Sequence, residues 1–119
     1  MLKVSISWDS KLRRTLGNKF LEKFVKETFQ EKGWVGIVFC DEKTIRRLNR
    51  KYRKVDRVTD VLTFPVKDPY SQGLWGEVFI CLPRARRQAK EYGHTLKEEI
   101  TLLLSHGLKG LLNGISKST

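Results

Sequence analysis

Two spacings of apolar residues alternate along this chain of 119 residues, and the alternation limits the folds that it can adopt. Apolar residues at every second position predict strands, and apolar residues three and four apart predict helices. Alternation predicts a strand at 2–8, and the continuous apolar run WVGIVFC predicts a strand at 34–40 that is buried on both faces. The segments at 58–66 and 74–81 are also expected to be strands. Helices are expected from residue 9 or 10 to about 32, from 41 through 52, from 83 to about 92, and from 95 through 111. The order β-α-β-α-β-β-α-α is typical of an α+β fold, here a small mixed four-stranded sheet packed against about four helices.

Residues at the ends of these segments fit the expected boundaries. Cap or first-turn residues open the helices, namely Asp9 or Ser10, Asp41, Pro83 and Thr95. Thr95 and Glu98 have the spacing of a capping box. Gly33 and Gly93 follow the first and third helices, where a glycine commonly ends a helix. Pro65 predicts the end or edge of the third strand, and residues 68–73 predict a turn.

The length of the chain predicts a single domain, residues 1–119, which can bury a core without disulfides. No apolar run is long enough to cross a bilayer. The N-terminal sequence MLKVSISWDSK alternates like a strand and lacks the apolar stretch of a signal peptide. We therefore expect a cytoplasmic protein with no membrane partner.

The charge of the chain favours a polyanionic partner. Lysine and arginine number 24 and aspartate and glutamate 13, a formal net charge of +11. The excess is clustered, because residues 43–57 hold eight basic side chains against one acid, and residues 84–90 hold a second group. Binding to an acidic membrane would need exposed bulky apolar residues, and those present here are needed for the core. Nucleic acid is therefore the favoured partner.

Two cysteines, Cys40 and Cys81, lie in the strand-like segments IVFC and VFIC. The favoured interpretation is two small buried hydrophobic side chains in a reducing compartment. A disulfide or a two-cysteine metal site stays open, although no CxxC spacing supports it.

The stretch LLLSHGLKGLLNG, residues 102–114, carries one histidine on a leucine-rich helix. On a helical wheel His106 lies at the edge of the apolar stripe, and Gly110 lies beside it one turn later. His106 can be a metal ligand, a remnant of a metal site or a bystander. A zinc site needs at least three protein ligands, and the other histidine, His94, lies at a helix boundary and can serve as a cap or turn residue. No serine–histidine–acid pattern and no phosphate-binding glycine loop stands out.

Two long segments resemble the YbeY-type rRNA maturation factors. Residues 48–65, LNRKYRKVDRVTDVLTFP, resemble the family pattern LNxxYRxxDxxTDVLSFP. Residues 74–108 are similar to the family segment that runs from a G-[DE]-[IV] strand through GH[ST] into HG. The resemblance covers nearly the whole chain. It implies a metal-dependent, single-strand-specific endoribonuclease that acts in rRNA processing and ribosome maturation, on a fold with a small mixed sheet and helices.

The resemblance also implies a zinc ion held by three histidines in the motif HGxLHLxGYDH. His106 and Gly107 match its first two positions. The second and third histidines are expected at Gly110 and Ser116, and neither residue is histidine. The C-terminal part of the motif is thus altered after Leu108, and the chain stops where the family continues. The chain is therefore either a nuclease of this family with His106 as metal ligand or a non-catalytic basic RNA- or ribosome-binding module. No small-molecule cofactor is expected.

The remaining matches suggest roles for other residues. By resemblance, Arg53 contacts RNA or stabilises charge at the scissile phosphate; the alternative is a surface arginine or one paired with Asp56. We expect Arg53 and His106 to be catalytic. The basic residues expected to hold RNA are Arg50, Lys51, Arg53, Arg57, Arg84 and Arg87. Asp56, Thr59 and Asp60 are expected to set the turn into the third strand. Three aromatic residues could stack on bases, although core packing or cleft lining is favoured for them: Tyr52, Phe64 and Trp75.

Overall fold

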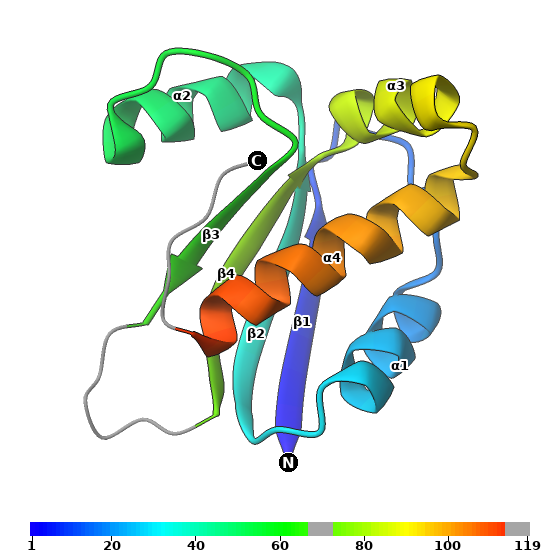
Figure 1. Ribbon diagram of the computed structural model, residues 1–119, viewed down its shortest axis with the longest axis vertical. Helices are drawn as coiled ribbons and strands as arrows, with labels where there is room; N and C mark the ends of the chain where they lie inside the picture. The colour runs from blue at the N-terminus through cyan, green and yellow to red at the C-terminus, as the bar shows by residue number, and fades with distance from the viewer. Residues whose placement is uncertain (67–72, 114–119) are drawn as a thin grey trace.

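The computed structural model describes residues 1–66 and 73–113, which form strands and helices in the predicted order (Figure 1). The strands are β1 (Leu2–Trp8), β2 (Gly33–Cys40), β3 (Val61–Pro65) and β4 (Leu74–Cys81). The helices are α1 (Asn18–Thr28), α2 (Glu42–Arg53), α3 (Leu82–Tyr92) and α4 (Leu96–Leu112). The predicted α+β class, with a four-stranded sheet and four helices, is confirmed. The turn was expected at residues 68–73, and residues 68–72 of it lie outside the described residues.

The sheet is mixed, with the strand order β1-β2-β4-β3. β1 pairs with β2 and β2 with β4 in parallel, whereas β3 pairs with β4 in the antiparallel sense. β3 therefore forms one edge of the sheet, and Pro65 ends it, as the sequence predicts.

The two faces of the sheet carry different helices. Alternate residues of all four strands pack with α1, α3 and α4 into the main core, in which Ile37, Phe39 and Ile80 are fully buried. α4 crosses the front of the sheet in Figure 1. The opposite face packs against α2 through a smaller cluster around Ile45 and Leu62. This arrangement leaves most of α2 exposed, and its basic residues lie there.

The first helix is shorter than predicted. The spacing of the apolar residues places its start at residue 9 or 10, but Asp9 forms a turn instead, in which its side chain accepts from the backbone N–H of Lys11 at 3.0 Å. Leu12 and Leu16 pack against the core from outside any helix, so they keep the apolar spacing without the helix. α1 ends at Thr28, because Phe29 adopts extended backbone and is buried.

The third strand is also shorter than the predicted 58–66. Thr59 and Asp60 precede it as buried polar residues. The side-chain carboxylate of Asp60 accepts a hydrogen bond from the backbone N–H of Val61 at 2.8 Å. The backbone carbonyl of Asp60 accepts another from the backbone N–H of Cys81, also at 2.8 Å. The side chain therefore serves the turn that leads into β3, as the sequence predicts for Asp60.

The start of α4 follows the capping-box prediction. The hydroxyl of Thr95 accepts from the backbone N–H of Glu98 at 3.1 Å, and the carboxylate of Glu98 accepts from that of Thr95 at 2.9 Å. α4 continues through Gly107 and Gly110 to Leu112. Among the described residues, no helix combines the length and apolar character that crossing a membrane requires.

Both cysteines are buried and unpaired, on neighbouring positions of β2 and β4. The Sγ atom of Cys40 donates to the carbonyl of Ile80 at 3.6 Å. Burial raises the pKa of both thiols, that of Cys81 to about 11, so both stay protonated at neutral pH. The interpretation of the two cysteines as small buried hydrophobic residues is confirmed.

Candidate functional site

The exposed face of α2 carries a cluster of basic side chains. The helix begins at Asp41, whose carboxylate accepts from the backbone N–H of Thr44 at 2.8 Å; this hydrogen bond holds the pKa of Asp41 below its usual range. Four basic side chains line a shallow hollow of about 280 Å³ on the helix: Lys43, Arg46, Arg47 and Arg50. Basic residues so close together repel one another, and a polyanion that binds there relieves the repulsion.

Two of the basic residues near this surface hold acidic partners. Arg46 binds Asp56 through Nε at 2.9 Å and through Nη2 at 3.4 Å, and this lowers the pKa of the Asp56 carboxyl. Arg87 of α3 binds the carboxylate of Glu42 at 3.2 Å. Both pairs are exposed, so each contributes little to stability. Arg87, expected to hold RNA, therefore also joins α3 to the start of α2.

The segment after Arg53 is fixed by a residue to which the sequence pattern alone assigned no role. Lys54 ends α2 in the left-handed conformation, with φ of 61°. The buried side chain of Asn49 donates to the carbonyl of Arg57 at 3.1 Å, and its backbone carbonyl accepts from Lys54 and Val55. Asn49 thereby ties residues 54–57 back to the helix. Its position in the LNxxYR pattern was the available signal.

His106 lies on α4, on the other side of the sheet from α2. Its side chain is exposed and makes no hydrogen bond or ion pair with the rest of the described chain. The next residue, Gly107, faces the sheet, where a Cβ atom would lie 3.0 Å from Val78 and 3.1 Å from Thr63. The two residues expected to be catalytic, Arg53 and His106, therefore lie on helices that cover opposite faces of the sheet.

The other histidine lies beside a buried acid that the sequence did not single out. The Nδ1 atom of His94 is 3.8 Å from Oε1 of Glu99, a carboxylate that is only 2% exposed. That oxygen has no hydrogen-bond partner among the described atoms. Burial raises the pKa of Glu99, the attraction of His94 opposes the rise, and the charge of Asp60 adds to it.

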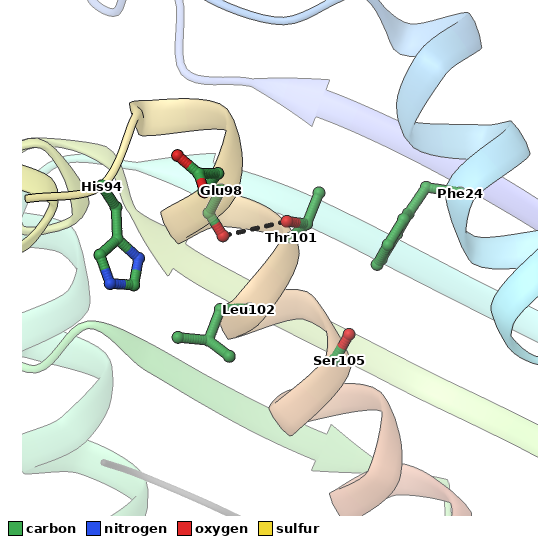
Figure 2. A pocket seen from close by; sticks show the side chains of 6 residues that line it. All are labelled: Phe24, His94, Glu98, Thr101, Leu102 and Ser105. Carbon is green, nitrogen blue, oxygen red and sulfur yellow. Dashed lines mark hydrogen bonds between the residues drawn. The ribbon is translucent and has the colours of Figure 1, made fainter.

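His94 lines an open hollow of about 390 Å³ beside α4. Figure 2 shows the side chains around it, with His94 at one end. Phe24 of α1 lies across from it, and the remaining lining comes from α4: Glu98, Thr101, Leu102 and Ser105. Neither Arg53 nor His106 lines this hollow, so it does not coincide with the site expected from the sequence.

The raised pKa of Glu99 predicts a pH-dependent effect of Glu99→Gln. A carboxyl whose pKa is higher in the folded state keeps its proton longer there, so the parent loses stability as the pH rises through and above the ordinary glutamate value of about 4.3. The glutamine variant lacks this loss. Its free energy of unfolding relative to the parent should therefore increase with pH, as measured by urea denaturation across the acidic and neutral range.

Glu98→Gln is the matched control for this prediction. The hydrogen bond from Thr95 lowers the pKa of Glu98, so its carboxylate stabilises the fold once ionised. The stability of this variant relative to the parent should fall as the pH rises. Slopes of the same sign for both variants would contradict the assignment of Glu99 as a buried acid that resists ionisation.

A three-ligand zinc site does not fit the described residues. No group of three or more histidine, cysteine, aspartate or glutamate side chains that could hold a metal occurs within residues 1–66 and 73–113. Gly110 offers no side chain where the i, i+4 partner of His106 would lie, and Ser116 lies outside the described residues. His94 precedes α4, so the helix rise places it about 15 Å from His106 along the axis. These two histidines cannot share one ion.

Comparisons with known proteins give one consistent answer. A family profile described as Endoribonuclease YbeY matches residues 3–113. Proteins named Endoribonuclease YbeY are similar to the chain: one from Desulforamulus reducens is 38% identical over 79% of this chain and 69% of its own length. One from Finegoldia magna is 45% identical over 66% of this chain and 52% of its length. One from Persephonella marina is 38% identical over 85% of this chain and 74% of its length. The chain thus spans between about half and three quarters of these relatives.

A solved structure is similar as well. The solution structure of TM1509 from Thermotoga maritima superposes with a TM-score of 0.64 at 28% identity. The match covers 92% of this chain and 71% of that protein, so the similarity extends over nearly the whole fold described above.

Proposed function

This chain belongs to the endoribonuclease YbeY family, and we propose that it acts on single-stranded RNA in rRNA processing and ribosome maturation in the cytoplasm. The observation that carries the proposal is the family match over residues 3–113. The net charge of +11 and the basic face of α2 support RNA as the partner. Ribosomal components are the further partners that we propose.

The basic residues around the end of α2 are proposed to hold the phosphates. Arg50, Lys51 and Arg57 are exposed, and Arg53 ends the helix next to the turn that Asn49 anchors. Arginine forms paired hydrogen bonds with phosphate oxygens, which suits Arg53 to a phosphate contact that steadies charge at the cleaved bond. Arg84 and Arg87 lie on α3 and extend the phosphate-binding surface, although Arg87 must exchange Glu42 for a phosphate.

A second candidate function is a non-catalytic RNA- or ribosome-binding module. It is favoured by the positions expected to carry metal ligands, because His106 is present while Gly110 and Ser116 replace the other two histidines. Such a module would keep the basic surface and would bind RNA without cutting it. No catalytic step through a metal is assigned to this chain.

RNA cleavage in the presence and absence of a chelator separates the two functions. The substrate is a labelled single-stranded RNA, with a duplex of the same sequence as the comparison. Cleavage of the single strand that the chelator abolishes supports the metal-dependent nuclease, whereas binding without cleavage supports the module. If the chain neither binds nor cuts single-stranded RNA, the proposal fails. An Arg53→Ala variant that binds and processes RNA like the parent would remove the role assigned to Arg53.

Reversing one charge on α2 should weaken RNA binding. Arg50 is exposed and makes no hydrogen bond or ion pair with the rest of the described chain, although its charge attracts Asp56. Arg50→Glu therefore removes a phosphate contact and adds a repulsion. We expect affinity for single-stranded RNA to fall by about fivefold or more, and the slope of log affinity against log salt to decrease by about 0.7. Fluorescence anisotropy at several salt concentrations measures both quantities.

Lys19→Glu provides the control with the same change of charge. Lys19 is exposed on α1, which covers the opposite face of the sheet from α2. This variant should keep most of the affinity and the parental salt slope. Equal losses in the two variants would show that RNA responds only to net charge, and α2 would lose its assignment as the RNA-binding face.

A further inference from the structure

A small aromatic hollow lies between α2 and the sheet, beside the basic face. Its volume is about 260 Å³, and its lining comes from both layers: Leu48 and Tyr52 of α2, Phe64 of β3, and Glu77 and Phe79 of β4. This is slightly below the usual range of about 300–1,000 Å³ for sites that hold drug-sized ligands. Its size therefore suits one small planar group better than a large cofactor.

The aromatic rings of the hollow hold one another in place and leave Tyr52 open to solvent. The Phe64 ring packs edge to face with two other rings. Its centre lies 5.6 Å from the centre of the Phe79 ring and 5.3 Å from that of the Tyr52 ring. Tyr52 is nevertheless 57% exposed. Tyr52 and Phe64 both line the hollow, which agrees with the predicted role of core packing or cleft lining for them. A rigidly supported and exposed aromatic ring is what base stacking needs.

Glu77 gives the hollow a polar group that has no partner among the described residues. Its half-buried carboxylate makes no hydrogen bond or ion pair with the rest of the described chain, although basic residues are abundant. A carboxylate repels phosphate, so the group that approaches Glu77 must bring N–H donors. Among the RNA bases, guanine presents two neighbouring donors, N1–H and N2–H, which can bind the two oxygens of one carboxylate.

The charge around the opening suits the backbone of RNA. The Nζ atom of Lys51 lies 5.1 Å from the centre of the Tyr52 ring, and Arg50 precedes it on the exposed face of α2. A phosphate near Lys51 would leave its base beside Tyr52. The hollow therefore combines a stacking ring, an acceptor for base edges and a cation for phosphate.

We propose that this hollow binds one unstacked base of single-stranded RNA and prefers guanine. Tyr52 stacks on the base, Glu77 accepts from its Watson–Crick edge, and Lys51 holds the adjoining phosphate. The inference rests on the proposed RNA-directed function and adds a base preference to it.

The test compares oligouridine strands of about ten nucleotides that carry one central guanosine, inosine or uridine. Inosine keeps N1–H and lacks the N2 amino group, so it removes one of the two donors. Fluorescence anisotropy at fixed salt should show the parent binding the guanosine strand about tenfold tighter than the uridine strand, with inosine between them. Tyr52→Ala should lower affinity for the guanosine strand about tenfold. Glu77→Gln should remove the preference for guanosine over inosine.

Tyr92→Ala is the control, because Tyr92 is an exposed tyrosine on α3, 62% exposed and outside the hollow. It should bind all three strands like the parent. If the parent binds the strands and Tyr52→Ala and Glu77→Gln bind them equally well, the base site is refuted and the RNA-binding function stands. Equal binding of guanosine and inosine by the parent refutes the guanine assignment. If the parent binds none of the strands, the proposed function fails, and the base site fails with it.

Discussion

Gly76→Ala should destabilise the protein severely, although the substitution adds only one methyl group. Gly76 lies in β4 with φ of 145°, a region that is nearly exclusive to glycine. An added Cβ atom would lie 2.5 Å from the carbonyl oxygen of Phe64 and 2.7 Å from Cδ2 of Leu111. The strand pairing of β3 with β4 and the packing of α4 would both have to shift. We expect a loss of about 3 kcal/mol or more in the free energy of unfolding, measured by urea denaturation.

Gly93→Ala separates backbone strain from the clash. Gly93 ends α3 with φ of 71°, and nothing lies within 4 Å of the position of an added Cβ atom. This variant should lose only about 1–2 kcal/mol, the cost of the left-handed conformation for alanine. Losses of equal size in the two variants would show that the close approach of Phe64 and Leu111 to Gly76 is relieved at little cost.

The order and type of the elements could be predicted because each strand and helix has a clear apolar spacing. The start of α1 could not be predicted, because Leu12 and Leu16 have a helical spacing but pack against the core from outside any helix. The capping box at Thr95 was predictable, since both of its hydrogen bonds are local in the sequence. The capping box therefore gave a reliable boundary, whereas apolar spacing and single cap candidates such as Asp9 and Gly33 did not, because α1 runs only from Asn18 to Thr28.

The site shows the same limit for contacts between distant residues. The sequence places many basic residues on α2, and in the structure four of them line one hollow: Lys43, Arg46, Arg47 and Arg50. The sequence does not reveal that Asp56 folds back onto Arg46, or that the side chain of Asn49 binds the backbone carbonyl of Arg57. The sequence analysis assigns Glu99 no role, whereas the structure buries it next to His94. Each of these contacts depends on how the chain returns to itself, which spacing does not encode.

Purified from cells without chelators, the chain should hold far less than one zinc ion. Tight structural or catalytic zinc sites use at least three protein ligands. His106 has no second histidine one turn later, and His94, which precedes α4, lies too far from His106 to share an ion with it. A single exposed imidazole binds zinc weakly and exchanges it during purification. Elemental analysis against protein concentration gives the zinc content directly.

Two variants decide what the zinc content means. Gly110→His combined with Ser116→His restores the histidine spacing of the family motif, and about one zinc per chain in this variant would show that the missing side chains limit metal binding. His106→Ala should leave the low content of the parent unchanged. If the parent instead holds about one zinc and His106→Ala loses it, His106 has ligands beyond the described residues or from another molecule. The metal-dependent nuclease would then be favoured over the non-catalytic module, because a metal ion would be present at His106.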